Sequence, residues 1–200
     1  EIGKYQANTG SGDCLSCKVG TAVGTTGNFK CFPCGVGRYA SAIGMRSCTA
    51  CAIGSYESNT GSSGCTKCAL GYYNGVTGMG KCTICPAGTY ASTLGSAKCL
   101  TCPAGKFSAE GSSSCTKCAI GSFAFYTGQE SCLKCPAGKY AGYPGTVSCT
   151  ACPSGKYNGA TGASRCMACG AGKYSNSAKS NPSCIDCPAG TYAGDTGTST

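Results

Sequence analysis

One aromatic side chain recurs along the chain about every seventeen residues, and the stretches between these aromatics are mostly small and polar. In most repeats the aromatic follows one glycine by two residues and precedes a second glycine by about five. Glycine accepts positive φ without a steric penalty, so both glycines predict turns. The pattern therefore predicts two short extended segments per repeat, joined by two turns, with the aromatic packing against its own and neighbouring repeats. The recurring aromatics are Tyr5, Tyr39, Tyr56, Tyr73, Tyr90, Phe107, Phe123, Tyr140, Tyr157, Tyr174 and Tyr192.

The cysteines have the same period. All 22 lie in C-x-x-C pairs that follow one another every 17 residues, with single steps of 16 and 18. The full repeat reads C-x-x-C-P-A-G-x-Y-x-x-x-x-G-x-x-x and is best displayed by residues 132–147. Pro-Ala-Gly favours a type II-like turn, because proline fixes its own φ and glycine accepts φ > 0. We interpret residues 1–200 as one continuous array of these repeats. The pairs begin at Cys14, Cys31, Cys48, Cys65, Cys82, Cys99, Cys115, Cys132, Cys149, Cys166 and Cys184.

Composition indicates what holds such an array together. Leu, Ile, Val and Phe number only 21 among 200 residues, which is too few for one hydrophobic core of this size. Cysteine makes up 11% of the chain (22 of 200), a level typical of secreted disulfide scaffolds. The expected fold is a small disulfide-rich repeat protein. It would be an elongated rod or solenoid of about eleven 17-residue units of short β-hairpins and turns, with little or no helix.

Histidine is absent, which removes the commonest general base and the commonest metal ligand. The seven carboxylates are scattered and never recur at one position of the repeat, so no acid/base pair is predicted. We therefore expect no enzyme activity, no catalytic or cofactor-binding residues and no cofactor. Paired C-x-x-C motifs are also a zinc-ribbon spacing, but eleven pairs do not divide into two-pair sites. A redox motif would need a βαβ context that is missing, and structural disulfides are the expectation for these cysteines.

Two disulfide schemes leave every repeat equivalent. The second Cys of one pair can bond the first Cys of the next pair, or each pair can close on itself. The first scheme closes 14-residue loops worth about 3 kcal/mol each, whereas the second restrains little of the chain. The first scheme leaves Cys14 and Cys187 over. Residues 1–5 align with Pro-Ala-Gly-x-Tyr, so we expect a window of a longer array, with these two cysteines bonded outside it.

At C-x-x-C-P-x-G-x-Y-x4-G-x3-C, the sequence resembles the ephrin-receptor-like cysteine-rich repeat and, more distantly, the first submodule of tumour-necrosis-factor-receptor domains. The resemblance covers essentially the whole chain and is specific for fold more than for role. It implies bonds between neighbouring pairs, because the Cys before P-x-G-x-Y in the receptor submodule bonds a Cys about fourteen residues on. Carried over, the pairs are Cys17–Cys31, Cys34–Cys48, Cys51–Cys65, Cys68–Cys82, Cys85–Cys99, Cys102–Cys115, Cys118–Cys132, Cys135–Cys149, Cys152–Cys166 and Cys169–Cys184.

Members of the resembled family include signalling-receptor ectodomains and long surface proteins. Uninterrupted regularity favours length over recognition, so we expect an extracellular structural rod, stalk or filament at a cell surface or in a matrix. The alternative is a receptor or adhesin ectodomain that binds a protein or glycan, with its site in the irregular segments Phe123–Tyr126 or Ser175–Ser183. The lack of repeating aliphatic columns favours a rod of about 110 Å over a β-solenoid of about 55 Å.

The formal net charge of +9 is spread over nearly every repeat. Several lysines lie in Gly-Lys-Tyr or Gly-Lys-Phe, at Lys4, Lys106, Lys139, Lys156 and Lys173. They are either solvated surface or a binding site for anionic glycans, and an extracellular array is not expected to meet nucleic acid. Identical surfaces also favour self-assembly, head to tail or laterally. No apolar run reaches membrane-spanning length, so no membrane insertion of this segment is expected. The Ser and Thr residues that cluster at exposed turns are either polar turn residues or sites for O-glycans, and the first interpretation is favoured.

Overall fold

The protein is described by a computed structural model that covers residues 1–8, 10, 12–176, 180 and 182–193. Within these residues there is no helix, and the secondary structure consists of two-residue strands separated by turns. The strands are β1 (Lys4–Tyr5), β2 (Leu15–Ser16), β3 (Thr21–Ala22), β4 (Phe32–Pro33), β5 (Arg38–Tyr39), β6 (Thr49–Ala50), β7 (Ser55–Tyr56), β8 (Thr66–Lys67), β9 (Tyr72–Tyr73), β10 (Thr83–Ile84), β11 (Thr89–Tyr90), β12 (Leu100–Thr101), β13 (Lys106–Phe107), β14 (Thr116–Lys117), β15 (Ser122–Phe123), β16 (Leu133–Lys134), β17 (Lys139–Tyr140), β18 (Thr150–Ala151), β19 (Lys156–Tyr157), β20 (Met167–Ala168), β21 (Lys173–Tyr174) and β22 (Ile185–Asp186).

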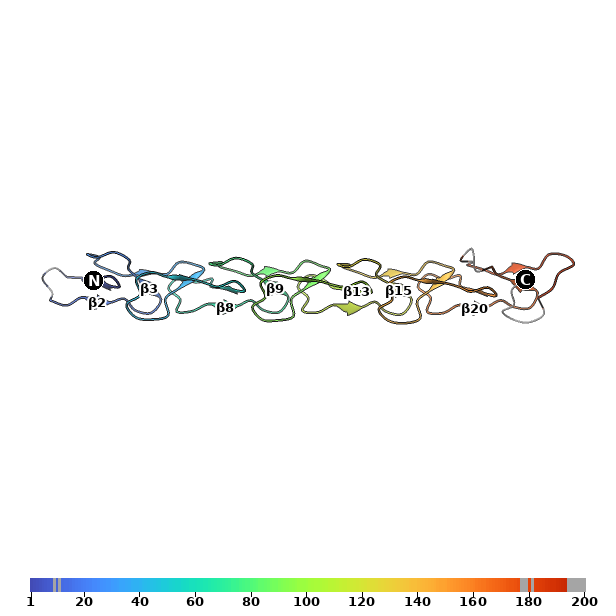
Figure 1. Cartoon of the computed structure of the whole chain (residues 1–200), viewed down its shortest axis with the longest axis horizontal. Helices are drawn as coiled ribbons and strands as arrows, with labels where there is room; N and C mark the ends of the chain where they lie inside the picture. Colours follow the sequence, from blue (N-terminus) through green and yellow to red (C-terminus); the bar gives the residue numbers. More distant parts are fainter. Residues whose placement is uncertain (9, 11, 177–179, 181, 194–200) are drawn as a thin grey trace. The chain divides into compact units, whose positions relative to one another are not determined.

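The chain divides into two compact units, and the strands form antiparallel hairpins within each. The first unit comprises Glu1–Cys85, Tyr90–Leu100 and Gly111–Ser113, and the second comprises Pro86–Thr89, Thr101–Glu110 and Ser114–Thr200. In Figure 1 the labelled strands of the first unit, β2, β3, β8 and β9, follow one another in chain order, as do β13, β15 and β20 in the second. An isolated two-stranded hairpin is marginally stable in water, so other contacts must stabilise each one.

Each hairpin joins two consecutive repeats. The strand after the first glycine of one repeat pairs with the strand between the two cysteines of the next. In β17–β18, Lys139 faces Ala151 and Tyr140 faces Thr150. The same register recurs in β1–β2, β3–β4, β5–β6, β7–β8, β9–β10, β13–β14, β15–β16, β19–β20 and β21–β22.

Both recurring glycines adopt positive φ, which confirms the turns that the sequence predicts. The first and second glycines of one repeat, Gly138 and Gly145, have φ of 81° and 82°. The first glycine is also a place where two backbone segments lie close together. A Cβ at Gly20 would overlap the carbonyl oxygen of Gly61, which lies two repeats further on. The second glycine Gly197 lies outside the described residues.

Backbone hydrogen bonds link each repeat to the next one. The amide of Gly121 donates to the carbonyl of Ala141 (2.8 Å), and the amide of Ala124 donates to the carbonyl of Thr146 (3.2 Å). In return, the amide of Gly145 donates to the carbonyl of Cys118 (2.8 Å). The same donors and acceptors recur along both compact units, so polar backbone groups of the interior are satisfied by the adjacent repeat.

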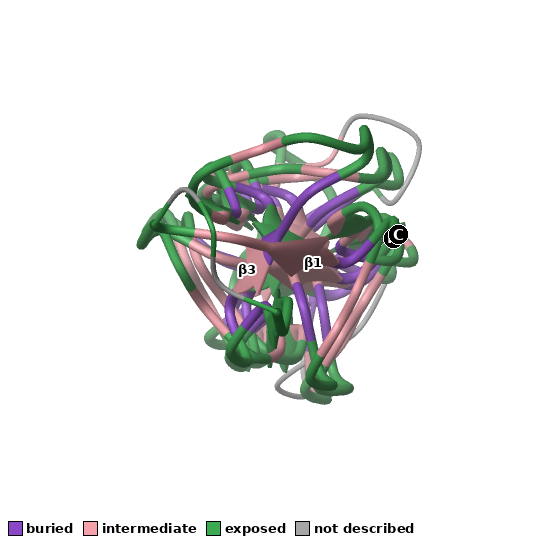
Figure 2. Cartoon of the chain, turned by 90° about the vertical axis from the view of Figure 1, so that its left-hand side faces the viewer, coloured by how far each residue is buried: buried purple, intermediate pink, exposed green. Residues whose placement is uncertain are grey.

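The buried interior contains almost no large aliphatic side chains. Most of its members are second cysteines of the pairs, first glycines and residues that follow the recurring aromatics. Figure 2 shows exposed turn residues at the periphery and buried segments further inward, around β1 and β3 of the first unit. Disulfides and a backbone ladder therefore replace the hydrophobic core that the composition cannot supply.

Candidate functional site

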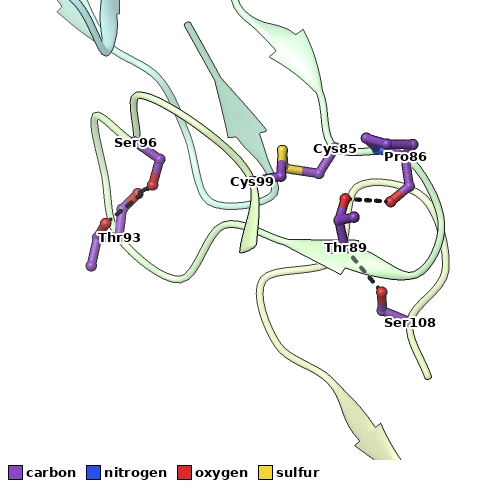
Figure 3. The surroundings of a disulfide bond; sticks show 7 residues. All are labelled: Cys85, Pro86, Thr89, Thr93, Ser96, Cys99 and Ser108. Atoms are coloured by element: carbon purple, nitrogen blue, oxygen red, sulfur yellow. Dashed lines mark hydrogen bonds between the residues drawn. A yellow bond between two sulfur atoms is a disulfide. The ribbon is translucent and has the colours of Figure 1, made fainter. Parts of the chain in front are cut away.

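Ten disulfides connect neighbouring repeats, and in each bond the half-cystine that is the second Cys of its C-x-x-C pair is almost fully buried. Each bond joins the second Cys of one pair to the first Cys of the next, with Cα–Cα distances of 5.6–5.8 Å. Figure 3 shows one of them, Cys85–Cys99, beside the Pro86 turn. The bonds are Cys17–Cys31, Cys34–Cys48, Cys51–Cys65, Cys68–Cys82, Cys85–Cys99, Cys102–Cys115, Cys118–Cys132, Cys135–Cys149, Cys152–Cys166 and Cys169–Cys184.

Two cysteines carry no disulfide in the structure. Cys14 is exposed and Cys187 is half-buried. Cys14 is the first member of its pair and Cys187 the second, which are the members that a preceding and a following repeat would bond. Their bonding outside residues 1–200 stays a prediction.

In most repeats the residue after the recurring aromatic is buried, a position that sequence reasoning missed. It is small or polar, and four repeats use Asn or Ser there. In each of those four, the side chain donates to a backbone carbonyl 19 residues earlier. Figure 3 shows Ser108 donating to the carbonyl of Thr89 (3.0 Å). The four donors are Asn74, Ser108, Asn158 and Ser175.

The recurring aromatics lie beside this buried position and are themselves half-buried, from Tyr5 to Tyr174. Tyr192 differs, with 89% of its surface exposed. Each aromatic strand residue faces the residue that follows the first cysteine of the next pair, as Phe123 faces Leu133. The aromatics are therefore only partly covered, while most of the smaller residues that follow them lie in the interior.

The second repeat has its aromatic on the opposite strand. Ala22 takes the usual aromatic position, and Phe32 lies directly across from it in β3–β4. The ammonium of Lys30 lies 5.4 Å from the centroid of the Phe32 ring, a distance that permits a cation–π contact. An aromatic is thus present in this hairpin although the sequence pattern lacks one at Ala22.

The irregular segment Phe123–Tyr126 places two aromatic rings at the surface. Phe125 and Tyr126 are 53% and 68% exposed, and their rings meet edge to face with centroids 4.9 Å apart. Tyr126 borders a hollow of about 360 Å³ that is also lined by Gln129, Glu130 and Leu133. Together with Gln129 and Glu130, the segment therefore combines aromatic rings with amide and carboxylate groups, as binding surfaces for sugars and peptides do.

The second irregular segment, Ser175–Ser183, is only partly described, because 177–179 and 181 lie outside the described residues. Ser180 has φ of 47°, which is uncommon for a residue other than glycine. It takes the place of the second glycine, since a Cβ at Gly138 would overlap its carbonyl oxygen. The sequence alone did not identify Ser180 as the turn residue, because no glycine marks it.

Charged groups are mostly solvated. Among the described residues, the ion pairs are Lys4 with Glu1 and Lys173 with Asp186, the latter at 2.6 Å. The hydrogen bond and the charge of Lys4 hold the pKa of the Glu1 carboxyl below its ordinary value. A hydrogen bond from the backbone N–H of Asn59 lowers the pKa of Glu57. No three His, Cys, Asp or Glu side chains of the described ranges are grouped so that they could hold a metal ion.

The family described as tyrosine-protein kinase ephrin type A/B receptor-like matches residues 20–68, 71–107, 105–152, 124–165 and 155–200. These matches cover most of the chain and repeat along it, as the hairpins and disulfides do. The chain belongs to the ephrin-receptor-like family of cysteine-rich repeats. The comparison with curated proteins gives no match.

Ephrin-receptor-like repeats are non-catalytic modules of extracellular receptor type. Ten disulfides agree with that location, because they form and persist in oxidising compartments. In the described part of the chain, no helix is long and apolar enough to span a membrane. Family membership thus gives the class of module, while the role of this array depends on its surfaces and on the way its repeats are joined.

Proposed function

We propose that this ephrin-receptor-like array is a structural element outside the cell, a disulfide-stapled rod, stalk or filament at a cell surface or in a matrix. The observation that supports it is the pattern of contacts between repeats. Each repeat bonds to the next through one disulfide and through backbone hydrogen bonds such as Gly121 to Ala141 and Gly145 to Cys118. A chain stabilised by contacts between neighbours gains length with every repeat and needs no central core.

Electron microscopy of the purified oxidised protein tests this proposal, together with disulfide mapping under non-reducing conditions. We expect uniform elongated particles in which every second Cys bonds the first Cys of the next pair. Compact round particles with the same disulfides would contradict the rod. Free thiols with bound zinc would contradict the disulfide scaffold itself.

The same regularity supports self-assembly, because identical surfaces recur along the array and can engage a second copy head to tail or laterally. Sedimentation velocity over a range of protein concentrations measures it. We expect species larger than one chain to accumulate as concentration rises. A single monomeric species at every concentration would contradict self-assembly and would leave the rod proposal standing.

A receptor or adhesin ectodomain is the second candidate, and the exposed pair Phe125 and Tyr126 favours it. The experiment compares binding of the labelled protein to intact cells and to immobilised glycans, for wild type and for the double variant Phe125→Ser with Tyr126→Ser. Tyr143→Ser is the matched control, because Tyr143 takes the same repeat position as Tyr126 and is 81% exposed. Loss of binding in the double variant alone supports a receptor site, and equal binding in all three proteins contradicts it.

A further inference from the structure

The register of the hairpins defines, beside the pair that contains the aromatic, a second pair of facing side chains, and in the second compact unit this second pair repeatedly contains lysine. The pair consists of the residue after the first glycine and the residue before the second cysteine of the next pair. From β13–β14 to β21–β22, no hairpin lacks a lysine there. The pairs are Lys106 with Lys117, Ser122 with Lys134, Lys139 with Ala151, Lys156 with Ala168 and Lys173 with Asp186.

Only the last of these hairpins neutralises its lysine. Lys173 donates to the Asp186 carboxylate at 2.6 Å, and the other lysines form no ion pair with the described residues. In β13–β14 two lysines face each other directly, an arrangement that destabilises a hairpin because like charges repel. No ion pair among the described residues offsets that repulsion, so a bound anion would relieve it.

Two of the lysines are partly ordered by the neighbouring repeat. The Cγ and Cδ atoms of Lys117 lie about 3.5 Å from the position that a Cβ of Gly145 would take, and Lys134 stands in the same relation to Gly162. Their aliphatic stems therefore rest on the second glycine of the next repeat while the ammonium groups extend towards solvent. Restricting the stem in advance lowers the entropy cost of binding an anion.

We propose that the hairpins β13–β14, β15–β16, β17–β18 and β19–β20 bind an acidic polysaccharide that carries sulfate or carboxylate groups along its length. Five lysines recur there without acidic partners on the same hairpins, and a linear polyanion presents charges at regular intervals in the same way. The recurring aromatics of these hairpins are half-buried, so they do not form the row of exposed rings on which single-stranded nucleic acid stacks. The proposal rests on the extracellular location in the proposed function and names a partner for it.

Heparin is the probe, and the full oxidised chain is titrated with it at several salt concentrations. We expect the double variant Lys106→Ser with Lys117→Ser to bind about 25-fold more weakly, because each lysine near an anionic surface contributes about fivefold. The dependence of log affinity on log salt should fall by about one for each lysine removed. Longer heparin chains should bind more tightly than short fragments, because they reach more hairpins.

Lys173→Ser is the matched control, since it removes a lysine from the same repeat position whose charge Asp186 already neutralises. It should lower heparin affinity less than twofold, and Lys106→Arg with Lys117→Arg should retain binding. Disulfide mapping of every variant verifies that the array is intact. Equal losses in Lys173→Ser and in the single variant Lys106→Ser would overturn the proposal in favour of unspecific attraction to net charge.

Two further results would also overturn it: tighter binding to single-stranded DNA than to heparin at equal salt, or binding to vesicles with phosphatidylserine but not to heparin. These outcomes are independent of particle shape. If the particles are rods that do not bind heparin, only the polysaccharide site is refuted. If they are compact but bind heparin, only the rod is refuted.

Discussion

Two glycines with the same backbone conformation lie in different surroundings, which separates the two reasons for keeping glycine at the first turn. Gly105 has φ of 80° and Gly172 has φ of 75°. A Cβ at Gly105 would overlap the carbonyl oxygen of Gly145, whereas a Cβ at Gly172 would meet no described atom within 4 Å. The first glycine is therefore needed both for its φ and for the contact between repeats.

We predict that Gly172→Ala costs about 1–2 kcal/mol, the strain of a left-handed alanine. Gly105→Ala should cost a further 1–3 kcal/mol or so, because the carbonyl of Gly145 must also move. Hydrogen exchange measures this locally, since the amide of Cys118 donates to Gly105 and the amide of Cys187 donates to Gly172. The change relative to wild type should be larger at Cys118 than at Cys187. Equal changes would mean that the close approach has no energetic importance.

The buried polar position gives a second test at the scale of one residue. Asn158 donates to the carbonyls of Lys139 and Ala160, both at 3.0 Å, and its Oδ1 accepts from the Ala160 amide at 3.1 Å. Asn158→Ala should cost about 1–3 kcal/mol, because it leaves buried backbone groups without partners. Alanine itself fits, since Ala124 and Ala141 are buried at the same position in other repeats.

The measurement for Asn158→Ala is hydrogen exchange at the Ala160 amide, which we expect to accelerate about tenfold or more. Asn28→Ala is the control. The Asn28 side chain also donates to a backbone carbonyl, that of Thr25, but it does so at an exposed turn. If both variants changed local exchange equally, burial would not account for the role of Asn158.

The sequence alone identified those residues whose conformation depends only on their immediate neighbours in the chain. The glycine turns follow from backbone sterics, and the positive φ of Gly138 and Gly145 confirms them. The buried position after the aromatic could not be found in this way, because Ala, Ser and Asn carry no apolar signal. Its burial depends on contact with the preceding repeat, as when the amide of Gly138 donates to the carbonyl of Asn158 (2.7 Å). Burial that arises from contacts between repeats therefore cannot be predicted from the sequence of a single repeat.

At the scale of one hairpin, β3–β4 shows that the aromatic belongs to the pair of strands and not to one position. Ala22 and Phe32 face each other where other hairpins have, for example, Tyr39 and Thr49. The repeat pattern alone shows only that Ala22 stands where other repeats have an aromatic, because Phe32 lies ten residues further on in the sequence. The register was needed to see that Phe32 supplies the ring.

We predict that Ala22→Tyr and Phe32→Thr are each destabilising alone and compensate each other when combined. The single tyrosine meets the existing Phe32 ring at a position where Ala22 is only 7% exposed, and the single threonine leaves the hairpin without an aromatic. The double variant recreates the Tyr39–Thr49 pair. A coupling energy of about 0.5–1 kcal/mol is expected, the size of a cross-strand aromatic pair.

Protection of the Cys34 amide, which donates to the carbonyl of Gly20 across this hairpin (2.9 Å), measures the coupling in the double-mutant cycle. Tyr39→Thr with Thr49→Tyr, the reverse exchange in β5–β6, provides the matched comparison. Additive effects in both hairpins would show that the two positions act independently and that the exchange in β3–β4 is a coincidence.

At the scale of the whole molecule, the length of the period makes a clean deletion possible. Residues 132–148 are one repeat of 17 residues, and their removal brings Cys149 to the place of Cys132, where Cys118 can bond it. Every remaining repeat keeps a neighbour with the same surface, so the other disulfides should form unchanged. A rod should shorten by about 10 Å, and a solenoid by about 5 Å.

Small-angle scattering and particle lengths in electron micrographs measure that change in the oxidised protein. Deleting only residues 138–146 is the control, because it removes both turn glycines of one repeat and leaves Cys135 too close in sequence to Cys149 for the native loop. This variant should form mixed disulfides, while the deletion of a full repeat should not. An unchanged maximum dimension with a smaller radius of gyration would contradict additive length, because repeats that contact only their neighbours must each contribute the same increment.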